Sequence, residues 1–374
     1  SITRSAIVER TGLTRSAVAT LVADLVDAGV AVEIGAHHDG QPGRPSSAAG
    51  LSDASPVALA FDIGVDRLRA ALVDLRGTVV ADLRVARPRS TTTVDDTLDE
   101  LMSLAERLGV VGHGADGRPL VGVGLAVPGT VTADGRTVVA APNLGWFDVE
   151  FADLVAPRFG DGVAIVVGNE ADLGASAEHR FGAARGVDDL LFIGGEIGVG
   201  GGLIVGGSRV GGRSGFDGVV GHMPVNPGGG VGACGAVGCW ETEVGERALL
   251  RRAGFDPDGG HEAVRALVQA ADAGESVVLD ALVEHGGWLA VGLATLINIF
   301  DPEVVVMGGF FHDVWPHLAD VVDRELARTS FGGRDRTGVV VAGQLGDSAR
   351  VVGAAELAFQ PLLEDPVGFG AQLV

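Results

Sequence analysis

One order of elements occurs twice along this sequence: a β-hairpin, a further strand and a helix. Apolar, β-branched runs separated by glycine-rich turns predict the first copy around residues 57–110 and the second around residues 188–300. Strands that alternate with helices are typical of α/β proteins, in which helices pack on a sheet. The repeat therefore predicts two similar α/β lobes with a cleft between them.

The first 50 residues follow a different pattern. Thr3 and Thr14 are suited to cap two short helices, and a glycine after each helix would end it. One face of the second helix is expected to be buried through Val18, Leu21, Val22, Leu25 and Val26. The segment 30–52 then predicts a strand, a Gly/Pro-rich tip and a return strand. Together these elements predict a helix-turn-helix followed by a wing.

A winged helix-turn-helix favours DNA binding, with the second helix in the major groove and the wing tip in the minor groove. Residues 1–50 nevertheless carry four arginines and five acidic residues, so their net charge is −1, whereas DNA-binding domains are usually basic. A small helical hairpin without a DNA role is the alternative. The predicted DNA contacts are Arg4, Thr14, Arg15, Ser16, Thr20 and Arg44.

The composition of the whole chain limits its partners and its location. A formal net charge of −22 argues against a surface that coats nucleic acid, so any DNA contact must come from a local patch. The sequence has no apolar run of the roughly 18 residues that a membrane span needs, and no apolar signal-peptide segment at its start. Two cysteines in 374 residues argue against a disulfide framework. We therefore predict a cytoplasmic protein without a membrane partner.

Seven motifs carry a resemblance to a known family. They are, in chain order, FDIGVDRLRAALVDLRG, AVPGTV, APNLGW, GNEADLGASAE, GVGGGLIVGG, GHMPV with CGAVGCWE, and DPEVVVMGG. The sequence resembles the ROK family (repressors, open reading frames and kinases), whose two lobes have the actin-like, sugar-kinase ATPase fold. With its first 50 residues it is similar to the transcriptional repressors of that family. The resemblance implies a repressor that binds operator DNA as a homodimer or homotetramer and responds to a sugar or sugar-derived effector.

The resemblance also implies three structural units. Residues 1–50 would form a winged helix-turn-helix domain whose first helix is missing from this sequence. Residues 56–148, together with about 346–363, would form the smaller α/β lobe. Residues 149–345 would form the larger α/β lobe, which carries the ligand site and a zinc-like loop.

Three positions depart from the pattern of the family's kinases. Asp66 and Ile197 stand in the two phosphate loops where the kinases carry Thr, and Glu170 stands at the position of the catalytic Asp. A carboxylate beside phosphate oxygens repels them. A base that is one methylene longer displaces the reacting atoms, and about 1 Å of misplacement costs roughly 100-fold in rate. We therefore expect no enzyme activity, with a residual carbohydrate kinase as the alternative.

The sugar-binding positions of the family are better retained. The resemblance implies a polyol site formed by Asn143, Glu170, His222 and Glu241. Val219 stands where the family carries a further Glu, so several charge-assisted hydrogen bonds to sugar hydroxyls are lost. This change would suit a ligand with an apolar group, such as an acetylated or deoxy sugar. A DNA-binding protein without any effector is a further alternative.

Both cysteines lie in one glycine-rich loop, together with a histidine. The zinc segment of the family has the form H-x9-C-x-C-x4-C, which His222, Cys234 and Cys239 match. The remaining cysteine position is Gly232, so three ligands of a closed tetrahedral site are present. Loss of a thiolate weakens binding, because the ligands bind together with folding of the loop. We therefore expect no bound cofactor, with retained zinc as the alternative.

Overall fold

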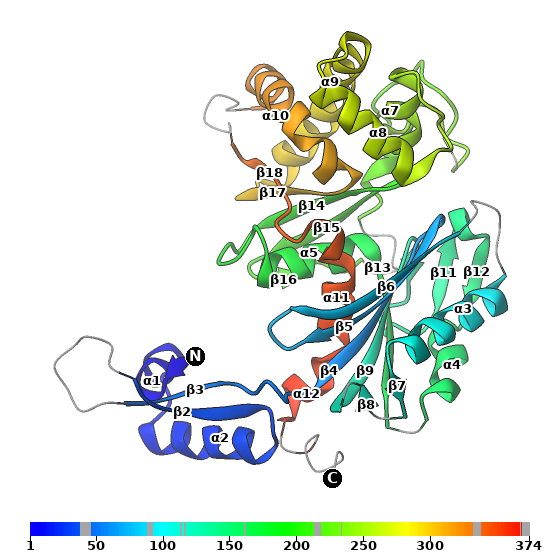
Figure 1. The fold of residues 1–374 in the computed structure, drawn as a ribbon. Helices are drawn as coiled ribbons and strands as arrows, with labels where there is room; N and C mark the ends of the chain where they lie inside the picture. The colour runs from blue at the N-terminus through cyan, green and yellow to red at the C-terminus, as the bar shows by residue number, and fades with distance from the viewer. Residues whose placement is uncertain are drawn as a thin grey trace.

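A computed structural model describes residues 1–37, 46–87, 93–112, 114–115, 117–160, 162–212, 218–232, 234–331, 338–366 and 368. Figure 1 shows a larger lobe above a smaller one, with a small N-terminal unit beside the base of the smaller lobe. The described strands of the two lobes form a seven-stranded, a five-stranded and a small three-stranded sheet. The described part of the chain therefore has the two α/β lobes that the repeated element order predicts.

The N-terminal unit, residues 1–51, contains two helices and a small antiparallel sheet in the order β1-β3-β2. Its elements are β1 (Ile2–Thr3), α1 (Arg4–Thr11), α2 (Arg15–Asp27), β2 (Ala31–His37) and β3 (Ser46–Leu51). Thr3 and Thr14 cap the helices, and each hydroxyl accepts a hydrogen bond of 3.2 Å from a backbone N–H of the first turn. Gly12, with φ of +68°, ends α1. Both predicted caps and the predicted hairpin strands are confirmed.

The predicted buried face of α2 is wrong at one position. Val18 and Val22 are buried, but Leu21 is 49% exposed. The helix packs against α1 on one side and β2 on the other, and these small neighbours cover only the row through Val18 and Val22. The tip of the predicted wing, with Arg44, lies outside the described residues.

The smaller lobe is built around the seven-stranded sheet. Its strands are β4 (Val57–Ile63), β5 (Arg67–Asp74), β6 (Val79–Ala86), β7 (Val110–Val111), β8 (Gly114–Ala115), β9 (Arg118–Val127) and β13 (Ala164–Asn169). Helices α3 (Val94–Arg107) and α4 (Phe151–Val155) pack in the core on one face. The small sheet β10 (Thr130–Val131), β11 (Val138–Ala141) and β12 (Trp146–Val149) borders this lobe. Every residue of β4 is buried, because both faces of the sheet are covered.

The expected boundary between the lobes at residue 149 is too early. β13 pairs in parallel with β9, from Ala164 opposite Gly122 to Asn169 opposite Val127. Phe151 and Val155 of α4 also lie in the core of the smaller lobe. The chain therefore leaves the smaller lobe only at α5 (Glu170–Phe181), which packs against β14 and β15 of the larger lobe.

The larger lobe contains the five-stranded sheet in the order β16-β15-β14-β17-β18. Its strands are β14 (Leu190–Gly195), β15 (Val199–Val205), β16 (Ser208–Arg209), β17 (Val304–Gly309) and β18 (Val340–Ala342). Its helices are α6 (Trp240–Val244), α7 (Glu246–Arg252), α8 (Gly260–Asp272), α9 (Ser276–Phe300) and α10 (Phe310–Thr329). α9 is long and apolar enough to cross a bilayer, but 56% of its most apolar window is buried. Its packing in the main core of this lobe is that of a central helix.

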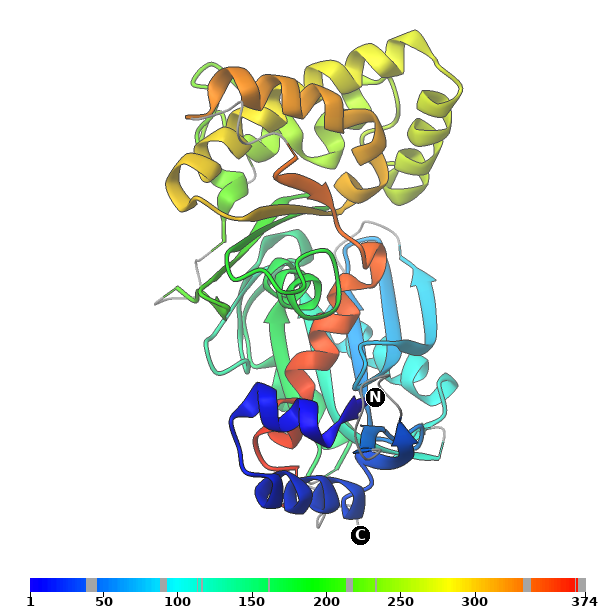
Figure 2. The same cartoon turned by 90° about the vertical axis from the view of Figure 1, so that its left-hand side faces the viewer.

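The chain then returns to the smaller lobe through α11 (Ala349–Ala358) and α12 (Gln360–Glu364). α11 packs on β4 and β9 and runs beside α5. The approach is close: a Cβ atom at Gly353 would lie 2.0 Å from the carbonyl oxygen of Leu173, so only glycine fits there. Figure 2 shows α11 descending from the level of the interlobe region to the helices of the N-terminal unit.

Candidate ligand site between the lobes

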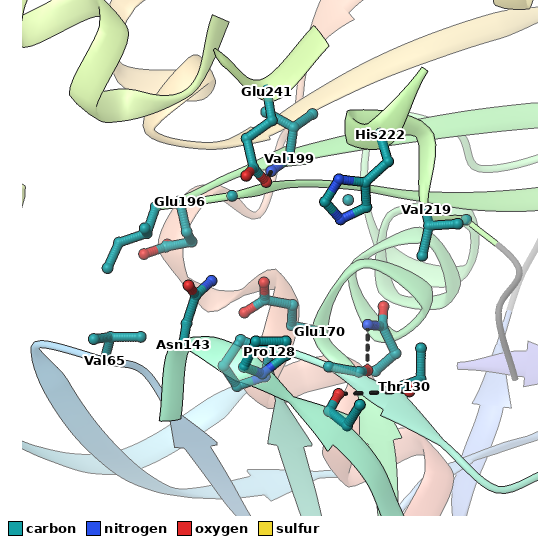
Figure 3. A pocket seen from close by; sticks show the side chains of 18 of the residues that line it. Val65, Pro128, Thr130, Asn143, Glu170, Glu196, Val199, Val219, His222 and Glu241 are labelled. Carbon is teal, nitrogen blue, oxygen red and sulfur yellow. Dashed lines mark hydrogen bonds between the residues drawn. The ribbon is translucent and has the colours of Figure 1, made fainter. Parts of the chain in front are cut away.

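A cavity of about 350 Å³ lies between the two lobes. The smaller lobe contributes the β4–β5 turn and the 3-10 helix η1 (Pro142–Leu144), while the larger lobe contributes the β14–β15 turn and the 3-10 helix η3 (Val220–His222). Figure 3 shows side chains from both lobes around this space. A ligand in the cavity would therefore contact both lobes at once.

The structure brings together the four predicted ligand-binding residues, since Asn143, Glu170, His222 and Glu241 all line the cavity. They come from four separate elements, η1, α5, η3 and α6 (Figure 3). The Val199 N–H donates a hydrogen bond of 3.1 Å to Glu241, which fixes this carboxylate at the edge of the β14–β15 turn. The four side chains thus offer an amide, an imidazole and two carboxylates to a polyol.

Glu170 is placed by the start of α5. Asn169 caps this helix, because its side-chain oxygen accepts hydrogen bonds from the N–H groups of Ala171 and Asp172. The Asn169 amide in turn donates a 2.8 Å hydrogen bond to the Gly129 carbonyl, which ties the helix start to the strand end beside it. Glu170 therefore enters the cavity from a rigid helix terminus rather than from a loop.

Apolar side chains form another part of the wall. Val65, Ile197, Val199 and Val219 all line the cavity, and Val219 is 42% exposed. Figure 3 shows Val219 next to His222 on the larger lobe. Position 219 is thus an apolar surface that faces the same space as the polar groups.

An ion cluster that the sequence reasoning missed adjoins the cavity. Arg350, the second residue of α11, is buried and its guanidinium lies 3.1 Å from Asp62, 2.6 Å from Glu196 and 3.7 Å from Glu170. We call Arg350, Asp62, Glu170, Glu196 and Asp347 the Arg350 cluster. Its members come from both lobes, because Glu196 lies in the β14–β15 turn whereas Asp62 lies on β4.

Asp347 extends the Arg350 cluster toward the smaller lobe. Arg67 and Arg84 each place a guanidinium nitrogen 2.5 Å from its carboxylate. Although burial favours the neutral form, Arg67, Arg350, Arg84 and Arg69 lower the pKa of Asp347 to about 2. This carboxylate is therefore ionised at every ordinary pH and anchors the end of the cluster.

The carboxyl groups nearest the cavity behave in the opposite way. Burial raises the pKa of Glu170 to about 7. The negative charges of Glu196 and Asp62 add to this rise, whereas the positive charge of Arg350 opposes it. Burial also raises the pKa values of Asp62 and Glu241. Within the described part of the chain, neither carboxylate oxygen of Asp62 makes a hydrogen bond. Arg350, helped by Arg67 at 3.5 Å from Glu196, thus balances more negative charge than it can fully neutralise.

The glycine-rich β14–β15 segment has a packing role. A Cβ atom at Gly202 would lie 2.6 Å from the carbonyl oxygen of Ala171, and one at Gly200 would lie 3.1 Å from the Ala171 side chain. The glycines therefore let β15 approach α5 closely. Ile197 in the same turn and Asp66 in the β4–β5 turn both line the cavity. The guanidinium of Arg350 contacts Glu196 of the β14–β15 turn and Asp62 near the end of β4.

The zinc-like loop brings three metal-binding groups together. The ligand atoms of His222, Cys234 and Cys239 all lie within 4.8 Å of one another, and the two sulfur atoms are 3.5 Å apart. A Cβ atom at Gly232 would lie 3.2 Å from the Cys239 sulfur, so the fourth position also faces the group but has no donor. The residues present fit a zinc ion with three protein ligands, and not the closed four-ligand set of structural sites.

The predicted DNA contacts lie on the N-terminal unit, far along the chain from the cavity. Thr14, Arg15, Ser16 and Thr20 are exposed at the start and along one side of α2. The Thr14 hydroxyl also caps the helix. Arg4 forms an ion pair with Glu33 of β2, so its guanidinium is engaged within the unit.

Two α/β lobes around a cavity of this kind define the actin-like, sugar-kinase class of fold. The ROK family model matches residues 58–360, so the chain belongs to the ROK family. Over 367 residues it is 26% identical to the xylose repressor of Bacillus subtilis, in a match that covers 97% of this chain and 92% of that protein.

Solved structures show the same fold. The crystal structure of a ROK family glucokinase from Streptomyces griseus, in complex with glucose and AMPPNP, is similar with a TM-score of 0.72 and 32% identity. The match covers 81% of this chain and 99% of that one. A ROK family transcriptional regulator, a homologue of the E. coli MLC protein, is similar with a TM-score of 0.76 and covers 100% of this chain and 93% of its own. Its 20% identity shows the fold alone.

Proposed function

We propose that this protein is a DNA-binding transcriptional repressor that responds to a sugar or sugar-derived effector bound between its lobes. The observation that carries the proposal is that one chain joins the interlobe cavity, lined by Asn143, Glu170, His222 and Glu241, to an N-terminal helix pair and hairpin. The match to a xylose repressor extends over 97% of this chain and so includes the N-terminal unit. The protein would act in the cytoplasm.

In this proposal the N-terminal unit is a winged helix-turn-helix and α2 is its recognition helix. Thr14, Arg15, Ser16 and Thr20 would contact the major groove, and Arg44 in the wing would enter the minor groove. Arg4 is a weaker candidate, because Glu33 already pairs with it. One unit supplies few base contacts, so a homodimer or homotetramer would place paired units on two half-sites.

The proposal assigns no phosphotransfer to this cavity. A kinase needs room for the phosphates of ATP beside the sugar, and it needs groups that stabilise their charge. Here the carboxylates of Asp66, Glu170 and Glu196 line the cavity, and negative charges repel phosphate oxygens. The match to a glucokinase at 32% identity nevertheless favours a residual carbohydrate kinase as the second candidate. Release of ADP from ATP in the presence of a panel of hexoses would establish that candidate.

The experiment that tests the proposal starts from the full chain. We expect it to select specific duplexes from a randomised DNA library, and D-xylose, D-glucose or N-acetylglucosamine to change its affinity for a selected duplex in a gel shift. Failure to select any duplex would overturn the DNA role. A selected duplex that no sugar affects, with no sugar raising the melting temperature, would favour the effector-independent alternative.

Replacement of Arg15 by Ala tests the docking of α2. Loss of a base or phosphate contact should weaken binding to the selected duplex by about 1–3 kcal/mol. Arg10→Ala is the matched control, because Arg10 is also exposed but lies at the end of α1. Equal affinity of the Arg15 variant and the unmodified chain would show that α2 does not read the DNA.

A further inference from the structure

A continuous helical path joins the interlobe cavity to the N-terminal unit. Arg350, the second residue of α11, lies beside the cavity, and α12 follows α11 after the single residue Phe359. We propose that α11 and α12 transmit the state of the cavity to the N-terminal unit, and that Arg350 is the positioning residue that responds to the ligand. This inference rests on the proposed function, because it assigns the route by which that same site would regulate DNA binding.

At the cavity end, Arg350 shares two carboxylates with any bound ligand. Glu170 and Glu196 line the cavity, and they also lie 3.7 Å and 2.6 Å from the guanidinium. Asp62 on β4 holds the same guanidinium from the smaller lobe at 3.1 Å. A ligand hydroxyl that donates to Glu170, or a change in the gap between the lobes that moves Glu196, must therefore alter the contacts of Arg350. The first turn of α11 is thus coupled to occupancy of the cavity.

Along its length, α11 is held too tightly to absorb such a change locally. Cβ atoms at Gly353 and Gly124 would lie only 2.0 Å and 1.9 Å from the carbonyl oxygens of Leu173 and Ala354, so the backbones of α11, α5 and β9 are in direct contact. The ion pair between Arg180 of α5 and Glu356 of α11, at 3.1 Å, adds a second link. Packed helices of this kind shift as units rather than bend. The ten residues of α11 carry a displacement over about 15 Å.

At the far end, α12 belongs to the apolar core on which the N-terminal unit packs, which we call the seat of this unit. Phe359 and Leu362 are buried in the same core as Val30, and Leu25 of α2 and Leu51 of β3 pack against that core. The Val30 N–H donates to the Leu25 carbonyl and the Ser52 N–H donates to the Val30 carbonyl, so this junction fixes the ends of α2 and β3 together. A shift of α12 would therefore reorient α2, which carries the proposed DNA contacts (Figure 2).

Two variants test the path from its two ends. Arg350→Lys keeps the positive charge, but the point-like ammonium cannot bridge Asp62 and Glu196 as the planar guanidinium does. Leu362→Ala loosens the seat of α2 without touching the cavity. Leu104→Ala is the matched control, because Leu104 and Leu362 are both 1% exposed but Leu104 lies in the other core of the smaller lobe.

The first measurement needs no ligand. Hydrogen–deuterium exchange of the Val30 and Ser52 amides in the full chain should be at least about fivefold faster in Arg350→Lys than in Leu104→Ala, the lower limit of typical coupling between distant sites. Exchange at these two amides that matches the Leu104 control would overturn the proposal. This measurement decides the inference even where no tested sugar binds.

The second measurement uses D-xylose and D-glucose with a selected duplex. Both Arg350→Lys and Leu362→Ala should lose at least about fivefold of the sugar-dependent change in DNA affinity. Leu362→Ala should keep the sugar-induced rise in melting temperature, whereas Leu104→Ala should keep both effects. Unchanged sugar dependence in both test variants would overturn the path. Sugars that leave the unmodified chain unaffected in both assays would count against the proposed function, not against the path.

Discussion

The two sides of the interlobe cavity differ in what fills them. On the ligand side, formed by Asn143, His222 and Glu241, polar groups from both lobes surround open space (Figure 3). On the other side, the charges of the Arg350 cluster pair with one another, since the buried Arg350 guanidinium lies between Asp62 and Glu196. Both sides are polar, but the ligand side surrounds open space, whereas the charges on the other side pair with one another. The comparison teaches that one fold can hold polar groups open toward a cavity on one side and pair them with one another on the other.

The largest expected effect comes from replacing Arg350, the cation at the centre of the Arg350 cluster. Arg350→Met would leave Asp62 and Glu170 without the cation that they share, and removal of one partner of a buried ion pair costs about 3–5 kcal/mol. We expect this loss in the free energy of unfolding, measured by denaturant titration at neutral pH. The loss should shrink as the pH falls, because protonation removes the uncompensated charge of carboxyl groups whose pKa values burial raises.

Arg252→Met is the control for this variant, since Arg252 is also partly buried and paired, with Glu284 and Glu243 of the larger lobe. Its loss of stability should be smaller. An Arg350 variant as stable as the unmodified chain at neutral pH would show that the Arg350 cluster is not a paired charge network, and the contrast between the two sides would fail.

A second variant tests the incomplete metal site beside the ligand side of the cavity. Gly232→Cys would place a third thiol beside Cys239, next to His222 and Cys234. Because loss of an outer-shell partner already costs about 10–100-fold in metal affinity, a restored direct ligand should raise zinc affinity by about 100-fold or more. Mass spectrometry of the dialysed protein should find one zinc per chain in this variant and less in the unmodified chain.

Gly230→Cys is the matched control, because a Cβ atom at Gly230 would meet nothing within 4 Å among the described residues. It adds a thiol to the same loop without directing it at the metal-binding group. Equal zinc content in the two variants would mean that position 232 does not complete the site.

The sugar role of the ligand side is tested by Glu241→Gln. The amide can still accept the hydrogen bond from the Val199 N–H, but it loses the charge that strengthens hydrogen bonds to sugar hydroxyls. We expect about tenfold weaker binding of whichever of D-xylose, D-glucose or N-acetylglucosamine binds the unmodified chain, measured by calorimetry. Glu243→Gln, two residues along α6 and bonded to Asn226, is the control and should bind normally.

The sequence predicts much of this molecule through short-range patterns. Thr3 and Thr14 occupy the predicted caps, because a hydroxyl before an apolar helical run has one favourable position. The four predicted ligand residues lie around one cavity, since ordered motifs of the family carry their relative positions. Leu21 was predicted wrongly because periodicity marks a helical face but not how far the neighbours of that helix extend.

What the sequence does not predict is long-range pairing. Arg350 lies in a run of small and apolar residues that reads as a C-terminal helix, and its closest partner, Glu196, is 154 residues away. One signal was present: a single arginine in an otherwise buried helix needs a partner. The same limit explains β13, whose parallel pairing with β9 no local pattern specifies.

The smallest expected effect lies where the two sides meet, at Glu170. Its pKa of about 7 in the folded chain exceeds the usual value of about 4.5, so the folded state holds the proton more tightly than the unfolded state. The carboxyl therefore lowers stability progressively as the pH rises from about 4.5 through 7. Glu170→Gln removes this pH-dependent loss of stability. Because the side chain is 20% exposed and solvent screens it, we expect a gain of only about 1 kcal/mol at pH above 7 and none below about 4.5. Denaturant titrations of the variant and of the unmodified chain across that pH range measure the difference in the free energy of unfolding. A gain that does not depend on pH would place Glu170 on the open, solvated side of the cavity and outside the Arg350 cluster.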